Sequence, residues 1–169
     1  YGSKIVVPGA GFLLNNEMGD FNPVPGMTDV EGRIGTEPNL AGPGKRMLSS
    51  MTPTVVEKDG DLFMVTGSPG GRTIINTVLQ TIVNVIDFGM NIQEAVDAPR
   101  FHHQWLPDRI SYERHGLSPD TLMLLESKGH RLVALERQGA AQAIRYDASA
   151  DVLEGAPDRR RAGSTALGY

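Results

Sequence analysis

Two consecutive glycines, Gly70 and Gly71, stand between an apolar stretch and the start of a long apolar pattern with helical spacing. Glycine lets the backbone approach a ligand closely, and the N–H groups at the start of a helix are unpaired and attract negative charge. Such donors suit an anion site or an oxyanion hole. A plain strand-to-helix turn also needs glycines, and it is the commoner explanation of so short a motif. A phosphate-binding loop is excluded because no Gly-Lys-Ser/Thr follows.

Two carboxylates, Glu17 and Asp20, lie three residues apart beside asparagines in a glycine-rich context. They could bind an ammonium group through charged hydrogen bonds. They could also act as a general acid/base pair, or they could be ordinary solvated charges. The spacing alone favours solvated charges.

Two hydroxyls, Ser49 and Ser50, follow the cations Lys45 and Arg46. Paired hydroxyls with nearby cations suit a carboxylate or phosphate ligand, but Ser-Ser before Met-Thr-Pro is also typical of a turn that precedes a strand. A nucleophilic serine is disfavoured because no G-x-S-x-G motif surrounds the pair.

The histidines do not predict a metal site. His102 and His103 are adjacent, so they point to different sides of an extended chain, and a zinc site needs further ligands. We expect structural hydrogen bonds for both. The basic run at residues 159–161 lies beside Asp158, and we expect it to be solvated or ion-paired.

The composition excludes several classes of protein. The chain of 169 residues has a formal net charge of −4, whereas nucleic-acid binding usually needs a basic face. It has no cysteine, so disulfides and thiol catalysis are excluded. No apolar run reaches the ~20 residues that a membrane helix needs, and no signal peptide is visible. The first residues are typical of a domain interior, so we expect the true start of the protein to lie upstream of Tyr1.

The order of apolar patterns predicts a single α+β layered domain over residues 1–169. An Asp-Gly turn predicts a β-hairpin, and the helix after it is apolar almost all round, so we expect it to be buried against a sheet. The loop at 22–44 is unusually long and is a candidate lid. The expected strands are 5–7, 12–14, 54–57, 62–66, 109–113, 131–136 and 142–146, and the expected helices are 72–88, 91–98 and 118–128.

Four stretches resemble consecutive motifs of the γ-glutamyltranspeptidases, which are also called glutathione hydrolases. Each stretch alone is a weak or moderate signal, but four in the family order are specific. The resemblance covers nearly the whole chain, down to Gly168-Tyr169. The stretches are LLNNEMGDF (13–21), GPGKRMLSSMTP (42–53), TGSPGG (66–71) and APRFHHQW (98–105).

Members of that family are made as one precursor that cleaves itself into a large and a small subunit. The resemblance implies that this chain is most of the small subunit of an αββα N-terminal nucleophile hydrolase, with the nucleophilic Thr upstream of the segment. It also implies a large-subunit partner, no cofactor, and a periplasmic or secreted location. It assigns the α-ammonium of the substrate to Glu17 and Asp20, the α-carboxylate to Ser49 and Ser50, and the oxyanion hole to the N–H groups of Gly70 and Gly71.

The implied reaction is γ-glutamyl acyl transfer. The Thr hydroxyl would attack the γ-carbonyl of glutathione or another γ-glutamyl compound, and the acyl-enzyme would pass to water, an amino acid or a peptide. The chain departs from the family pattern at two positions that it contains. Gly19 replaces the first of two acids before the Phe, and Glu31 stands where related bacterial lids carry an aromatic gate residue.

Two other functions are compatible with these residues. A glutaryl or cephalosporin acylase of the same fold acts on substrates without an α-ammonium, so the Glu17 and Asp20 pair argues against it. A non-catalytic binding or assembly subunit is supported only by the absence of the nucleophile from this segment.

Overall fold

The computed structural model describes residues 2–168, which form two compact units. The first unit ends at Ser50 and the second begins at Met51. Tyr1 and Tyr169, at the two ends of the resemblance, lie outside the described residues. The single domain expected from the sequence stays a prediction.

The first unit has little regular structure. It contains two short 3-10 helices, η1 (Glu17–Asp20) and η2 (Glu37–Asn39). The two short strands expected near its start do not form. One isolated β-bridge, between Val6 and Leu13, stands in their place. Of the candidate substrate-binding residues, Glu17 and Asp20 lie in η1, and Ser49 and Ser50 lie in a loop.

The long loop at 22–44 is closed at its base by a β-bridge between Asn22 and Leu40. Its far part is held by an ion pair in which Arg33 Nε lies 2.6 Å from Asp29 Oδ2. Apart from η2, this loop has no helix in the described structure. The prediction of a long loop is confirmed, and its role as a lid stays a prediction.

The second unit begins with the expected hairpin, formed by β1 (Thr54–Lys58) and β2 (Asp61–Gly67). Asp59 (φ 55°) and Gly60 (φ 92°) make the turn with positive φ, as a tight hairpin with an Asp-Gly turn requires. The two strands pair antiparallel, and the hairpin prediction is confirmed.

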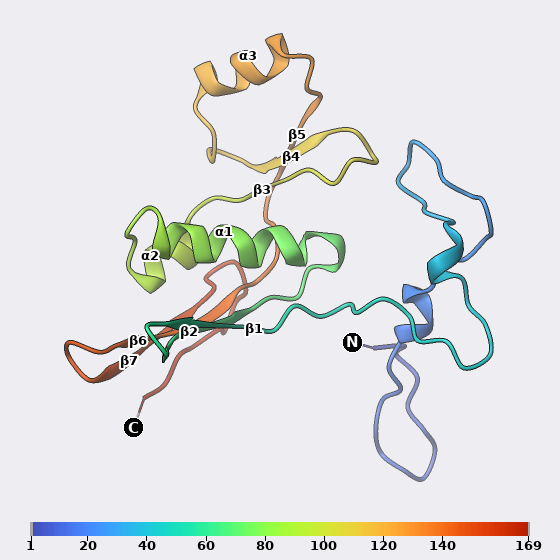
Figure 1. Ribbon diagram of the computed structural model, residues 1–169, viewed down its shortest axis with the longest axis horizontal. Helices are drawn as coiled ribbons and strands as arrows, with labels where there is room; N and C mark the ends of the chain where they lie inside the picture. Colours follow the sequence, from blue (N-terminus) through green and yellow to red (C-terminus); the bar gives the residue numbers. More distant parts are fainter. Residues whose placement is uncertain (1, 169) are drawn as a thin grey trace. The chain divides into compact units, whose positions relative to one another are not determined.

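Two further strands extend the hairpin into a four-stranded antiparallel sheet in the order β1-β2-β6-β7. They are β6 (Gln142–Asp147) and β7 (Val152–Pro157), which lie side by side in Figure 1. The β6 prediction is confirmed. The sequence did not predict β7, since its Gly155 and terminal Pro157 interrupt the alternation that identifies a strand.

Two helices, α1 (Ile74–Ile86) and α2 (Ile92–Asp97), cover one face of this sheet (Figure 1). The capping box predicted for α2 is present: Glu94 N donates to Asn91 Oδ1 at 2.9 Å, and Asn91 N donates to Glu94 Oε2 at 3.0 Å. The buried core between helices and sheet consists of Met64, Val85, Ile92, Ala95, Val96, Ala141, Ala143 and Ala156.

Helix α1 is buried against the sheet along one face, as the sequence predicts. Its buried residues Ile74, Thr77, Val78, Thr81 and Val85 recur at helical spacing and face the sheet. A second apolar stripe lies on an adjacent side of the helix and is exposed among the described residues. This stripe comprises Ile75, Leu79 and Ile86.

A second, smaller sheet contains β3 (Phe101–His102), β4 (Ile110–Glu113) and β5 (Leu132–Leu135). Strands β4 and β5 are parallel, and α3 (Pro119–Ser127) forms the crossover between them. Ser118 caps α3 through a hydrogen bond from Thr121 N, as expected. The α+β class is therefore confirmed. Within residues 2–168 no helix is long and apolar enough to cross a membrane.

Candidate active site

The Gly70-Gly71 turn joins β2 to α1 through a 3-10 helix, η3 (Gly71–Thr73). Both glycines have positive φ, 152° and 55°. The Gly70 carbonyl accepts hydrogen bonds from Thr73 N at 3.1 Å and from Thr73 Oγ1 at 2.9 Å. Within the described part of the chain, the N–H groups of the two glycines have no acceptor. They are thus donors at the start of a helix, as the sequence predicts.

A second loop, residues 138–141, lies directly behind this turn. Ala140 N donates to Ser68 Oγ at 3.0 Å. A Cβ added to Gly70 would lie 3.4 Å from Gly139 Cα and 2.7 Å from Thr73 Oγ1. Gly139 itself has φ 66°. The backbones of Gly70 and Gly139 therefore approach each other closely, and this contact helps to hold the turn.

A buried network of two ion pairs lies beside that loop. Arg160 contacts both oxygens of Glu113 at 2.6 Å, and Arg100 Nη1 lies 2.8 Å from Asp158 Oδ2. Arg160 Nη1 also lies 3.3 Å from Asp158 Oδ1, which joins the two pairs. The side chains of Arg100 and Asp158 are 2% and 0% exposed. The ion-paired interpretation of the basic run is confirmed for Arg160.

The network holds the 138–141 loop through backbone hydrogen bonds. Gln138 N donates to Glu113 Oε1 at 2.6 Å, and Ala141 N donates to Asp158 Oδ2 at 2.7 Å. Arg100 Nη1 donates to the Gln138 carbonyl at 2.8 Å. The chain of contacts thus runs from the buried charges through the loop to the glycine turn. The sequence did not predict it, because its members come from four separate segments.

Burial alone would raise the pKa of the two carboxyls in this network. For Glu113, hydrogen bonds from Arg160 and from the Gln138 N–H outweigh burial and hold the pKa below its usual value. For Asp158, hydrogen bonds from the Arg160 N–H and the Arg100 side chain do the same. Both carboxylates are therefore ionised at neutral pH.

We expect acid to destabilise the second unit through these carboxyls. Their pKa is lower in the folded than in the unfolded chain, so the stabilisation is complete above the unfolded values, near 4.5 for Glu113 and 3.8 for Asp158. It is lost as pH falls through the folded values. Urea unfolding at a series of pH values should show a falling free energy of unfolding below about pH 4.5, with a shallower fall in Glu113→Gln. Equal stability at pH 6 and pH 3 would contradict this expectation.

In the first unit, the structure brings Glu17 and Ser50 together although 33 residues separate them. Ser50 Oγ donates to Glu17 Oε2 at 2.9 Å, and both side chains are partly buried. Asp20 ends η1 and is also partly buried, and Ser49 is exposed beside Ser50. One carboxylate and one hydroxyl of the predicted site are thus neighbours, whereas Gly70 and Gly71 belong to the second unit.

The adjacent histidines make the structural hydrogen bonds that the sequence predicts. His102 Nε2 lies 2.7 Å from Gln104 Oε1, and His103 Nε2 lies 3.0 Å from Asp108 Oδ1. Among the described residues, no three His, Asp or Glu side chains gather in a way that could hold a metal ion.

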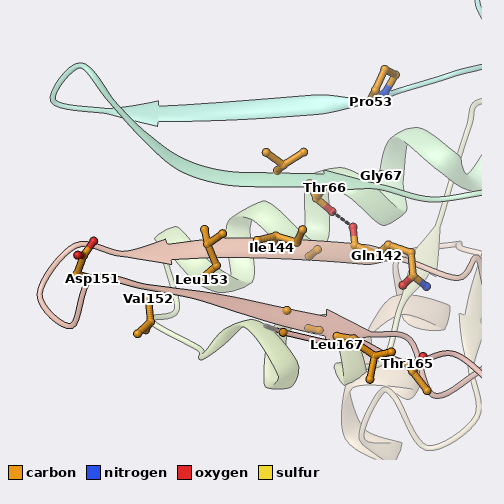
Figure 2. A pocket seen from close by; sticks show the side chains of 16 residues that line it. Pro53, Thr66, Gly67, Gln142, Ile144, Asp151, Val152, Leu153, Thr165 and Leu167 are labelled. Carbon is orange, nitrogen blue, oxygen red and sulfur yellow. Dashed lines mark hydrogen bonds between the residues drawn. The ribbon is translucent and has the colours of Figure 1, made fainter.

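A hollow of about 1100 Å³ lies on the face of the four-stranded sheet that α1 and α2 leave open. Figure 2 shows Ile144 of β6 and Leu153 of β7 lining it, together with Leu167 near the end of the chain. Paired neighbours across the strands place Val55, Val65 and Ile144 in one exposed apolar row. This surface contains none of the predicted site residues. Its apolar character suits protein packing rather than a zwitterionic ligand.

The chain is similar to glutathione hydrolases in sequence and to gamma-glutamyltranspeptidases and an acylase in structure. The glutathione hydrolase proenzyme of Escherichia coli (strain K12) is 51% identical over 169 residues, which are 100% of this chain and 29% of that protein. The structure of the Helicobacter pylori gamma-glutamyltranspeptidase T380A mutant matches 95% of this chain and 87% of that chain, with TM-score 0.87 and 47% identity. Cephalosporin acylase from Bacillus halodurans matches 99% of this chain and 30% of its own, with TM-score 0.81 and 27% identity.

These likenesses define the class of fold as that of the N-terminal nucleophile hydrolases, as expected. The protein-family model described as "Gamma-glutamyltranspeptidase" matches residues 1–168. The chain therefore belongs to the γ-glutamyltranspeptidase family. It spans about 30% of the length of the curated relatives it matches first.

Proposed function

We propose that the full-length protein hydrolyses γ-glutamyl compounds such as glutathione and transfers their γ-glutamyl group to amino acids or peptides. Family membership supports this activity, and the contact between Ser50 Oγ and the Glu17 carboxylate carries the assignment of the substrate. The α-carbon of a γ-glutamyl group bears an ammonium and a carboxylate. The Glu17 carboxylate offers an acceptor for the ammonium, and the Ser50 hydroxyl, which donates to Glu17 in this structure, would turn its proton to the substrate carboxylate.

In the proposed mechanism, an N-terminal Thr upstream of this chain attacks the γ-carbonyl carbon with its hydroxyl oxygen. Its own amine, or a water, takes the hydroxyl proton and passes a proton to the leaving amine as the C–N bond breaks. The resulting ester is then cleaved by water or by the amine of an acceptor. The N–H groups of Gly70 and Gly71 would donate to the oxyanion formed in each attack.

The proposed partner is the large subunit of the same precursor. Two apolar surfaces support it: the exposed stripe of α1 and the open face of the four-stranded sheet. In an αββα sandwich the open face of one sheet packs on a second sheet, which the large subunit would supply. Intact-mass measurement of the purified protein tests both parts of this proposal. Two chains, the smaller starting with Thr upstream of residue 1, are expected, and one uncleaved chain would contradict them.

Loss of a substrate-binding carboxylate should weaken substrate binding more than it slows the chemistry. We expect Asp20→Asn to raise KM for γ-glutamyl-p-nitroanilide by about 10- to 100-fold, since a hydrogen bond to a charged group contributes about 1.5–3 kcal/mol. Asp59→Asn in the exposed hairpin turn of the second unit is the matched control, because it makes the same chemical change at a residue with no predicted role in binding. Equal KM values in the two variants would remove Asp20 from the binding site.

A glutaryl or cephalosporin-type acylase is the second candidate, because the Bacillus halodurans acylase shares the fold. Its substrates lack the α-ammonium that the Glu17 carboxylate would bind. We expect turnover of γ-glutamyl-p-nitroanilide to exceed that of glutaryl-p-nitroanilide by at least 100-fold, because a missing charged partner leaves buried polar groups unpaired. Preference for the glutaryl compound would favour the acylase.

We also propose a periplasmic or secreted location, which rests on the family resemblance. Fractionation of the cells that make the protein tests this location. Recovery with the cytoplasmic marker would contradict it.

A further inference from the structure

Asn39 is unusual among the residues of the first unit. Apart from glycines, it is the one buried residue between positions 2 and 50, with 6% of its surface exposed. It ends η2, at the base of the 22–44 loop. Burial of a side-chain amide costs free energy unless its donors and acceptor form hydrogen bonds. The hydrogen-bond partners of Asn39 therefore indicate its role.

The Asn39 amide connects the two segments that carry the candidate substrate residues. Its Nδ2 donates to the Asp20 carbonyl at 2.6 Å, and its Oδ1 accepts from Leu48 N at 3.0 Å. Asp20 belongs to η1 with Glu17, and Leu48 immediately precedes the Ser49-Ser50 pair. The Asn39 side chain thus bonds to the backbone of both segments that meet in the Ser50–Glu17 contact.

The base of the 22–44 loop is closed without the Asn39 bonds to Asp20 and Leu48. Asn22 closes the base of the loop through other contacts: its Nδ2 donates to the Thr36 carbonyl at 2.7 Å, and its N–H donates to the Asn39 carbonyl at 2.8 Å. The side-chain amides of Asn22 and Asn39 meet at 3.3 Å. Among the side chains of residues 2–168, only that of Asn39 bonds to both Asp20 and Leu48.

We propose that Asn39 is a positioning residue of the substrate site, which sets the spacing between the Glu17 and Asp20 carboxylates and the Ser49-Ser50 hydroxyls. The inference rests on the proposed function and extends it to a residue that does not touch the substrate. A zwitterionic group requires its cation and anion partners at a set distance, and a displacement of about 1 Å costs up to 10²-fold in rate.

The first test compares Asn39→Ala with Asn22→Ala in the full-length protein. Alanine at position 39 leaves the Asp20 carbonyl and Leu48 N without their partner. Alanine at position 22 removes the bonds to Thr36 and the 3.3 Å contact with Asn39 Nδ2, but it keeps the Asn39 bonds to Asp20 and Leu48. With γ-glutamyl-p-nitroanilide we expect KM to rise about tenfold or more in Asn39→Ala and less than about threefold in Asn22→Ala, with kcat less affected in both. Equal KM values in the two variants would overturn the inference.

The second test uses the isosteric Asn39→Asp, which keeps the protein assayable if Asn39→Ala does not fold. A protonated carboxyl can still donate to the Asp20 carbonyl and accept from Leu48 N, but an ionised one cannot donate. The ratio of KM in this variant to KM in the wild type should therefore increase several-fold from acid to neutral pH. The other charged groups at the loop base, Asp20, Glu37 and Lys45, are the same in both proteins. A ratio that is constant with pH would overturn the inference.

The wild-type assay separates this inference from the proposed function. Absence of wild-type turnover would overturn both. Wild-type turnover with unchanged KM in the Asn39 variants would overturn the positioning role alone, because the activity itself would then be established.

Discussion

We expect Gly70→Ala to lower kcat for γ-glutamyl-p-nitroanilide by about 10²–10³-fold, the range typical of losing one oxyanion-hole donor. Gly70 has φ 152°, which L residues rarely adopt, and its added Cβ would lie 2.7 Å from Thr73 Oγ1 and 3.4 Å from Gly139 Cα. Rotation of the peptide planes on both sides of residue 70 would relieve the unfavourable φ. That rotation moves the N–H groups proposed to stabilise the oxyanion. The measurement is kcat per cleaved molecule, with cleavage counted by intact mass.

Two neighbouring glycines provide graded controls for this prediction. Gly71 has φ 55° but open space around its added Cβ, so Gly71→Ala meets backbone strain without a collision and should lower kcat less. Gly67, at the end of β2, has neither positive φ nor a close neighbour, so Gly67→Ala should leave kcat within about threefold. Equal losses at all three positions would show that the turn is needed for folding rather than for oxyanion binding.

We expect Asp158→Ala to lower the free energy of unfolding by about 3–5 kcal/mol, the cost of breaking a buried ion pair by removal of one partner. The substitution leaves the Arg100 guanidinium, which is 2% exposed, without its counter-charge. It also removes the acceptor of Ala141 N, which holds the 138–141 loop. Equilibrium urea unfolding of the full-length protein, followed by circular dichroism, gives the difference.

Asp97→Ala is the matched control for the buried ion pair. Asp97 pairs with Arg159 at 3.2 Å, but the Arg159 side chain is 75% exposed. Exposed pairs contribute about 0–1 kcal/mol, so this variant should unfold close to the wild type. If both variants lose the same stability, the buried network is not a principal source of stability in the second unit.

Local structure in this protein follows from short stretches of sequence. The Asp-Gly turn specifies the hairpin, and Asn91 with Glu94 specifies the start of α2, because these signals act between residues that are close in the chain. Strand β7 was missed although its partner β6 lies close by in the chain, because Gly155 and Pro157 interrupt the alternation that identifies a strand. The exposed stripe of α1 was also missed, since an apolar pattern does not tell which apolar side chains this chain itself covers.

The sequence by itself determined the family, the α+β class and the residues expected to hold a γ-glutamyl group, because these depend on residue types in a set order. Only the tertiary structure decided which of these residues contact one another. It brings Ser50 to Glu17, joins Asp20 and Leu48 through Asn39, and sets the 138–141 loop behind Gly70. These contacts link residues far apart in the chain. Their partners are therefore chosen by the packing of whole segments, which spacing along the sequence does not record.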